Sequence, residues 1–257
     1  MDAPLLHQAS VLGSTLASTL SLWRGTRLVK VASQPKKPLK LYDIEGSPYC
    51  RAVREALTAL GLDARIYPCP RGGKRYRSEA QRIGGKRQFP LLVDSNTASV
   101  LYESADIVEY LFRTYGAQAT PAAYRASALT PRLSSLGSVL RGMRGITARP
   151  SRRPKKLLDL WSFESSPYSR LVRERLTELE LAYTLHNVGK EQWADMGPAT
   201  MRFGGKGPYK PKPGGRREQL LVQWGRVQLP YLEDANTGEK MFESAKIIAY
   251  LEHHYAR

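Results

Sequence analysis

The segment from Gly46 to Arg51 reads Gly-Ser-Pro-Tyr-Cys-Arg and places a hydroxyl, a thiol and a cation within one short turn. An apolar run typical of a strand precedes it and one typical of a helix follows, so it should lie at a helix N-terminus, where anions are favoured. There Ser47 could donate its hydroxyl to an anion, a bond worth about 1.5–3 kcal/mol. Cys50 could instead act as a nucleophilic thiolate. The plainer alternatives are that Ser47 only caps the helix and that Cys50 packs as a small buried residue.

The same junction occurs twice. Residues 160–181 repeat residues 41–62 with thirteen identities in 22 positions, and residues 229–250 repeat residues 89–110 with ten. Agreement at this level is beyond chance and indicates two copies of one unit. The second copy carries an insertion at about 196–217, whose Gly, Pro and basic residues predict a flexible loop.

The second copy lacks the thiol of the first. Ser47 recurs as Ser166, but Ser169 stands where the alignment would place a second Cys50. The feature that both copies share is therefore a serine followed by Pro-Tyr and an arginine. This favours recognition of an anion or a thiolate over chemistry by the protein's own sulfur.

The duplication predicts an α/β protein with two tandem domains, called here the first repeat and the second repeat. Each should be introduced by a short helical preamble, at 12–23 and 133–143, and a basic linker. The predicted boundaries are 1–38 for the first preamble and linker, 39–116 for the first repeat, 117–156 for the second preamble and linker, and 157–257 for the second repeat. Because the preamble also recurs inside the chain, we interpret the N-terminal segment as structure rather than as a transit peptide.

Periodicity and turn residues give the order of elements in the first repeat. We expect strand, helix, strand, helix, strand, strand and helix, in that order. The ranges are 39–44, 48–60, 64–67, 72–85, 89–93, 99–102 and 104–115. A strand-helix-strand crossover followed by an antiparallel hairpin gives a four-stranded mixed sheet with flanking helices.

Composition limits the classes of function. The chain has 257 residues, a net charge of +17 and 42% hydrophobic residues, typical of a globular protein with an anionic partner. No apolar run approaches the roughly 18 residues of a membrane span. Two cysteines favour a reducing compartment, which we take to be the cytoplasm. The basic excess is concentrated at 141–156 and 198–217, where it forms either a solvated surface or a binding surface for an acidic protein.

The order of elements and the motifs together resemble the thioredoxin fold. Within it, the chain is similar to the glutaredoxin-like N-terminal domain of glutathione transferases, present in tandem over 39–116 and 157–256. The motifs that carry the resemblance are Ser47-Pro48-Tyr49-Cys50-Arg51, Gln88-Phe89-Pro90, and Tyr102-Glu103-Ser104-Ala105-Asp106-Ile107, each with a counterpart in the second repeat.

The resemblance implies a site for glutathione as co-substrate, with Ser47 stabilising its thiolate. The peptide bonds before Pro90 and Pro230 would be cis, and a Glu-Ser pair at the last helix would receive the γ-glutamyl group. Lys86, Arg87 and Gln88 are candidates for its glycyl carboxylate. The predicted residues are Ser47 and Cys50 for catalysis; Pro48, Tyr49, Lys86, Gln88, Phe89, Pro90, Glu103 and Ser104 for binding in the first repeat; and Ser166, Pro167, Tyr168, Leu229, Pro230, Glu243 and Ser244 in the second, degenerate or supporting repeat.

Two other functions compete with a glutathione transferase-like protein. One is a non-catalytic interaction module that holds an acidic partner through its basic loops, although nothing in the sequence favours nucleic acid specifically. The other is a thiol-disulfide oxidoreductase that uses Cys50. We expect no metal, since the adjacent His253 and His254 point in different directions on a helix and no Cys/His cluster occurs.

Overall fold

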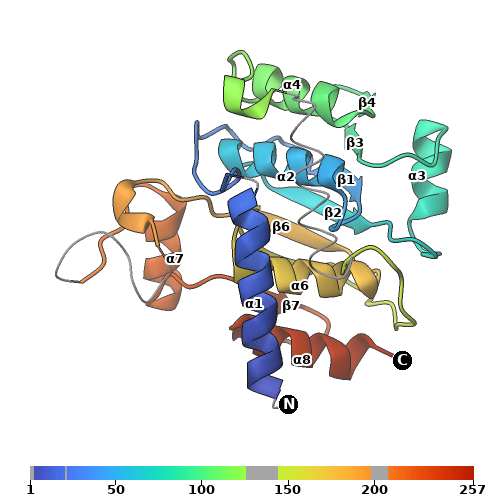
Figure 1. Ribbon diagram of the computed structural model, residues 1–257. Coiled ribbons are helices and arrows are strands. Elements are labelled where there is room, and N and C mark those ends of the chain that lie inside the picture. Colours follow the sequence, from blue (N-terminus) through green and yellow to red (C-terminus); the bar gives the residue numbers. More distant parts are fainter. Residues whose placement is uncertain (1–2, 21, 126–143, 198–207) are drawn as a thin grey trace.

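The computed structural model describes residues 3–20, 22–125, 144–197 and 208–257 and joins the two repeats in one eight-stranded sheet (Figure 1). The strand order is β4-β3-β1-β2-β6-β5-β7-β8. The α/β, thioredoxin-like fold predicted from the sequence is confirmed, while the domain boundaries remain a prediction. The expected pair of separate four-stranded sheets is replaced by one continuous sheet.

The first repeat has the predicted elements in the predicted order. They are β1 (Leu39–Asp43), α2 (Pro48–Leu60), β2 (Ala64–Pro68), α3 (Arg77–Gly84), β3 (Leu91–Asp94), β4 (Ser99–Leu101) and α4 (Ser104–Thr114), followed by the short η1 (Ala122–Tyr124). Pro48 begins α2 and Gly61 ends it in the left-handed conformation, as its sequence signals predict. Only α3 is clearly shorter than its predicted range, because its glycine-rich start stays irregular.

The second repeat follows the same plan. Its elements are β5 (Leu158–Ser162), α6 (Pro167–Glu178), β6 (Tyr183–Asn187), η2 (Trp193–Asp195), α7 (Arg216–Trp224), β7 (Tyr231–Asp234), β8 (Glu239–Phe242) and α8 (Ser244–Tyr255). Of the predicted flexible loop at about 196–217, residues 198–207 lie outside the described residues, and α7 begins near its end, at Arg216. The second preamble at 133–143 also lies outside the described residues.

The strands β2 and β6 join the two halves of the sheet. They pair antiparallel, with Ala64 opposite Leu185 and Ile66 opposite Tyr183. In a single thioredoxin-like unit each of these strands would be an edge, with unpaired backbone groups and a half-buried apolar face. Pairing them satisfies the backbone groups and merges the apolar residues of both repeats into one contiguous core.

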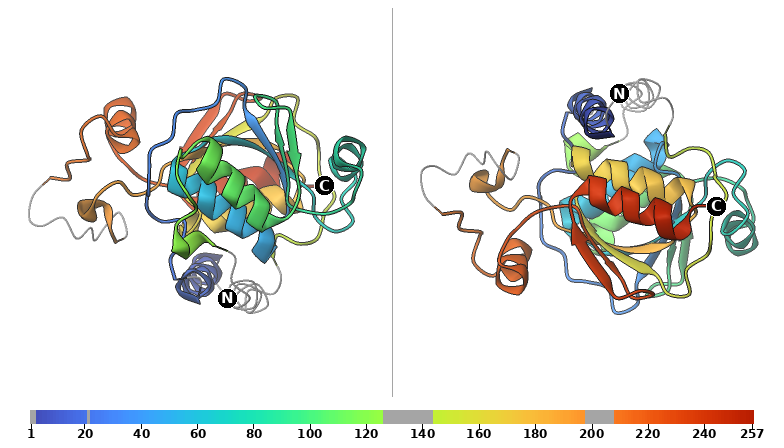
Figure 2. Two further views of the ribbon diagram at one scale, coloured as in Figure 1. Left: turned by 90° about the horizontal axis from the view of Figure 1, so that it is seen from above. Right: turned by 90° about the horizontal axis from the view of Figure 1, so that it is seen from below.

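The helices α2, α4, α6 and α8 cover one face of this sheet (Figure 2). α2 packs beside α4 and α6 packs beside α8, while α3 and α7 lie at opposite sides of the molecule. The N-terminal helix α1 (Ala3–Leu20) lies outside this helical layer and packs on α6. The first preamble is therefore part of a helix that packs against the second repeat rather than against the first repeat that follows it.

Each repeat contains the same set of side-chain hydrogen bonds around one aspartate. Asp94 accepts from Tyr110 at 2.7 Å and from Tyr115, and Asp234 accepts from Tyr250 at 2.8 Å and from Tyr255. In both cases the aspartate that ends the third strand of the repeat (β3 or β7) ties the hairpin to the last helix of the repeat. The duplication thus extends to tertiary contacts.

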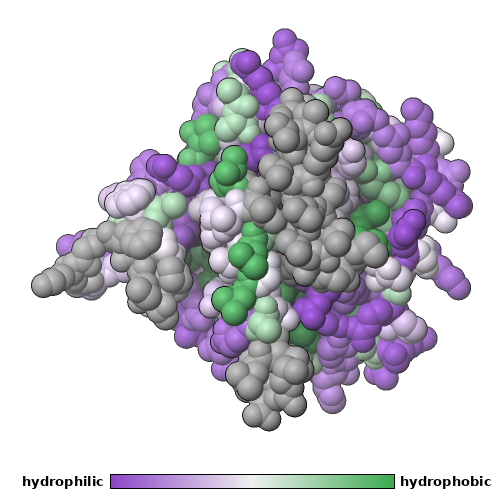
Figure 3. Space-filling model, in the orientation of Figure 1, coloured by the Kyte–Doolittle hydropathy of each residue, from purple (hydrophilic) through white to green (hydrophobic). Residues whose placement is uncertain are grey.

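Several basic residues form ion pairs or hydrogen bonds within the chain. Arg149 pairs with Glu252 at 2.7 Å, and Arg216 pairs with Asp63 at 2.5 Å. Arg217 is buried and donates to the carbonyl of Gly189. Basic residues of the linker and the insertion thus act partly as packing and pairing groups. The face shown in Figure 3 is nonetheless mostly hydrophilic, with hydrophobic residues gathered over α1.

Candidate functional site

Ser47 is the N-cap of α2, as the sequence predicts. Its Oγ accepts a hydrogen bond from the backbone N–H of Cys50 at 3.4 Å. A hydroxyl that accepts one bond still carries a hydrogen to donate. Capping the helix and donating to an anion are therefore compatible roles for this half-buried side chain.

The register of the sheet brings the cis-proline turn beside the Ser47 turn. Tyr42 in β1 lies opposite Leu91 in β3, so the preceding Pro90 lies near the end of β1, where the chain turns toward Ser47. The Phe89–Pro90 peptide bond is cis, and so is Leu229–Pro230 in the second repeat. Both cis bonds were expected from the family resemblance.

The start of α4 adjoins the segment before the cis-proline. Glu103 has a positive φ of 59°, an uncommon conformation for a residue other than glycine, and Glu243 repeats it at 70°. The side chain of Gln88 donates to the Glu103 carboxylate. The half-buried Ser104 is the first residue of α4, where backbone N–H groups favour an anion.

The basic residues near this turn are held by neighbours. The Lys86 backbone N–H donates to the hydroxyl of Tyr102 at 3.2 Å, and the Lys86 ammonium lies 5.8 Å from the centre of that ring. Arg87 donates to Gln81 at 2.6 Å. Lys86 and Gln88 therefore flank the cis-proline turn, while Arg87 is directed to α3.

Cys50 is a packed core residue in this structure. Its side chain is fully buried, and its sulfur accepts from the Ile44 N–H at 3.4 Å. Burial, together with the nearby Asp43 carboxylate, raises the pKa of the Cys50 thiol to about 12. Burial likewise raises the pKa of Cys69, and both cysteines are free thiols. The geometry gives no support to a nucleophilic thiolate at either position.

A buried ion cluster lies between the two Ser-Pro-Tyr turns, and sequence reasoning missed it. Arg54 on α2 reaches Glu164 at 3.0 Å, and Arg173 on α6 reaches Glu45 at 3.1 Å. Each arginine also contacts the acid of its own repeat, Arg54 to Glu45 at 3.2 Å and Arg173 to Glu164 at 3.0 Å. The available signal was that both repeats keep a glutamate two residues before the candidate serine and an arginine seven residues after that serine.

The cluster is asymmetric in charge. Asp43, which contacts Arg54, is replaced by Ser162 in the second repeat. Burial raises the pKa of Asp43 to about 6 despite the opposing charge of Arg54. Burial alone would raise the pKa of Glu164, but Arg173 and Arg54 lower it to about 2. Because Glu45 and Glu164 each precede a candidate serine by two residues, the cluster fixes both turns.

The arginine shared by the two motifs binds α1. Arg51 donates to the carbonyl of Ala17 at 3.4 Å, and Arg170 donates to the carbonyl of Ser14 at 3.2 Å and to Ser18 Oγ at 3.0 Å. Cations near the C-terminal carbonyls of a helix are favourable. The interpretation of this arginine as part of an anion-recognition motif is therefore not supported.

The corresponding groups of the second repeat are buried. Ser166 caps α6 by accepting from the Ser169 N–H at 3.2 Å, and both Ser166 and Ser244 are only 3% exposed. The adjacent Tyr168 is exposed, as is Tyr49 in the first repeat. The two candidate serines of the first repeat thus keep partial access to solvent, while their second-repeat counterparts do not.

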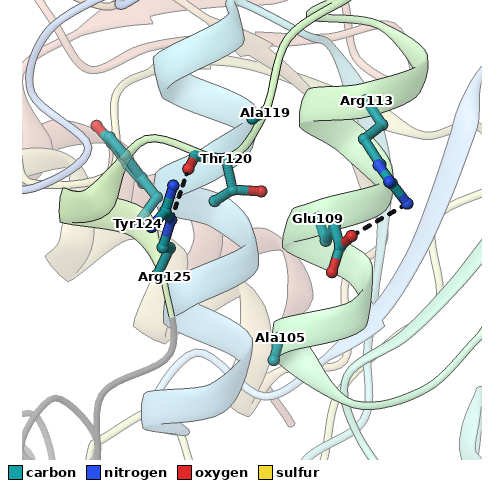
Figure 4. Close-up of a pocket in the computed structure, with 7 residues that line it drawn as sticks. All are labelled: Ala105, Glu109, Arg113, Ala119, Thr120, Tyr124 and Arg125. Atoms are coloured by element: carbon teal, nitrogen blue, oxygen red, sulfur yellow. Dashed lines mark hydrogen bonds and ion pairs between the residues drawn. The ribbon is translucent and has the colours of Figure 1, made fainter.

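A groove of about 370 Å³ lies beside α4 (Figure 4). No residue of the cis-proline turn lines it. Arg113 pairs with Glu109 on one side, and Arg125 donates to the carbonyl of Thr120 on the other. The groove begins at Ala105, next to Ser104, but no lining residue comes from the Ser47 turn.

Among the residues that the structure describes, no three His, Cys, Asp or Glu side chains are grouped as a metal ion would require. Within the same ranges, no helix has both the length and the apolar character to cross a membrane.

Comparisons with known proteins identify the family. The family model for the N-terminal domain of glutathione S-transferase matches residues 41–119 and 160–257. A delta-class glutathione transferase of Nilaparvata lugens is 30% identical, covering 30% of this chain and 36% of its own, with a TM-score of 0.26. A glutathione transferase of Bombyx mori is 29% identical, covering 34% and 39%, with a TM-score of 0.29, so this chain spans well under two thirds of either structure's length. The comparison with curated proteins gives no match. Since the family model matches more than half of the chain, in two segments, the protein belongs to the glutathione S-transferase N-terminal domain family.

Proposed function

We propose that the protein binds glutathione through its first repeat, as a glutathione transferase-like protein, and that Ser47 donates its hydroxyl to the glutathione thiolate. The observation that carries the proposal is the meeting of three elements near the end of β1. These are the Ser47 cap, the cis-Pro90 turn and the Glu103–Ser104 start of α4. The family resemblance assigns all three to glutathione, and both serines are accessible in part.

Each element has a separate task in this proposal. The backbone beside Pro90 pairs with the cysteinyl backbone of glutathione, and the helix start at Ser104 receives its γ-glutamyl carboxylate. Glu103 meets the γ-glutamyl ammonium, and Gln88, which already contacts Glu103, lies beside it. Lys86 is the nearby cation available for the glycyl carboxylate.

Stabilising the thiolate is the contribution of Ser47. A hydrogen bond from its hydroxyl to a charged sulfur is worth about 1.5–3 kcal/mol. At about 1.4 kcal/mol per pKa unit, this lowers the pKa of the bound thiol by about one to two units. The thiolate sulfur could then form a bond to an electrophilic carbon, whose leaving group would depart with its electron pair.

The test is calorimetry with reduced glutathione, combined with the ultraviolet absorbance of the thiolate as a function of pH. We expect Ser47→Ala to raise the pKa of bound glutathione by about one to two units. Ser166→Ala is the matched control, because it removes the equivalent cap from α6 but should leave the thiol pKa unchanged. No binding heat at millimolar glutathione would refute the proposal. An unchanged thiol pKa in Ser47→Ala would show that Ser47 caps α2 but does not stabilise the thiolate.

A further inference from the structure

Helix α1 lies against the second repeat at the end that corresponds to the proposed glutathione site. The small residues Ser14, Ala17 and Ser18 are buried on its inner face, which allows close approach to α6. Ser18 Oγ donates to the carbonyl of Ser165 at 2.8 Å, directly before the N-cap Ser166. Together with the bonds from Arg170, this fixes one end of α1 over the start of α6.

The other end of α1 reaches the start of α8. His7 Nε2 lies 3.1 Å from Ser244 Oγ, at hydrogen-bond distance. Ser244 is the second-repeat counterpart of Ser104, which the proposed function assigns to the γ-glutamyl carboxylate. One helix therefore contacts both helix starts that would bind the ligand, and it hydrogen-bonds one of the two candidate serines.

We propose that α1 is a built-in plug of the second repeat, which occupies its glutathione site, while in the described residues Ser47 and Ser104 of the first repeat keep partial access to ligand. This rests on the proposed function, namely that the equivalent site of the first repeat binds glutathione. The burial of Ser166 and Ser244, against the partial exposure of Ser47 and Ser104, is the difference between the repeats that the plug accounts for.

The contact between α1 and α6 has the character of one that can open. Its buried apolar side chains in the described part of α1 are small, Val11 and Ala17. Ser14 Oγ and Ser169 Oγ are buried without a hydrogen-bond partner among the described residues. Each such hydroxyl has lost its hydration without gaining a hydrogen bond from the described residues, and release of α1 would restore that hydration. The plug is thus held mainly by its backbone and hydroxyl contacts.

The experiment releases α1 in the full-length chain and counts bound ligand. Ser14→Phe places a large side chain where Ser14 has no exposed surface, and Val11→Asp buries a charge on the same face. Leu12→Phe is the matched control, since it introduces the same side chain as Ser14→Phe at a position that is 67% exposed. Amide hydrogen exchange over residues 165–170 and 244–247 reports release, and calorimetry reports the number of glutathione molecules bound.

The expected result is one glutathione per chain for the wild type and Leu12→Phe, and two for both release variants, with faster exchange only in the latter. One glutathione for every form, despite faster exchange in the release variants, would overturn the plug and leave the proposed function intact. Two for the wild type would also overturn it, as would unchanged exchange in both release variants. No binding by any form would refute the proposed function and the plug together.

Discussion

Replacing Arg54 with methionine should destabilise the protein more than any surface substitution. The Arg54 side chain is 1% exposed and lies between Glu164 of the second repeat and two acids of the first, Asp43 and Glu45. Methionine fills similar space but leaves three buried carboxyl groups with Arg173 as their remaining cation in the cluster. Breaking a buried ion pair by removing one partner costs about 3–5 kcal/mol.

The assay is equilibrium unfolding by urea at pH 8, with thermal unfolding as a second measure. For a chain of this size, about 2–4 °C of midpoint accompanies each kcal/mol, so the midpoint should fall by about 6–20 °C. The control is Arg113→Met on α4, where an arginine 73% exposed pairs with Glu109 at 3.1 Å. That surface pair should contribute at most about 0.5 kcal/mol.

A pH series separates loss of charge from loss of packing. Asp43 has a raised pKa of about 6, and Arg54 is the neighbouring cation that opposes the rise. Without Arg54 the carboxyl groups protonate more readily, so the loss of stability caused by Arg54→Met should be smaller at pH 5 than at pH 8. A loss below about 1 kcal/mol, or one independent of pH, would refute the account of the cluster.

Two further predictions concern stability. Burial alone would lower the pKa of His186, but hydrogen bonds to two aspartates raise it to about 9. Protonated His186 therefore stabilises the fold below about pH 6.5, and this contribution is lost as the pH rises toward 9. His186→Phe, which keeps an aromatic ring against Trp161, should flatten the pH dependence of urea unfolding between these values, and an unchanged slope would contradict the assigned ion pairs. Gly25→Ala should cost more than Gly214→Ala in the same assay, because both glycines have a φ of +72° but only at Gly25 would a new Cβ meet a neighbour, at 2.8 Å. Equal losses would show that the close approach at Gly25 relaxes without cost.

Local signals in the sequence were sufficient for the elements of each repeat. Ser47 and Pro48 start a helix because an N-cap and a fixed φ act within one turn, and Gly61 ends it for a similarly local reason. The internal duplication supplied the rest, since every element found in the first repeat could be sought in the second. The cis bonds before Pro90 and Pro230 came from the family resemblance, because local preference for cis is weak.

The sequence predicted which residues form the candidate site, but only partly their exposure to solvent and their pKa values. The sequence indicated which serines begin helices, but not that Ser166 and Ser244 would be buried while Ser47 and Ser104 stay accessible in part. A buried Cys50 was one of the two alternatives that the sequence left open, and the structure decides for it, with a raised thiol pKa. Access and pKa depend on what packs over a group, and that neighbour can come from anywhere in the chain.

The sequence alone determined that this protein is a duplicated thioredoxin-like unit with a serine, rather than a pair of cysteines, at its helix start. The tertiary structure decided how the copies combine. The pairing of β2 with β6 and the contacts of Arg54 with Glu164 and of His7 with Ser244 join residues far apart in the sequence. Such contacts leave no periodic signal, because they depend on the shape and charge of surfaces that exist only after each unit has folded. For this protein, those long-range contacts join two similar halves into one sheet and one core.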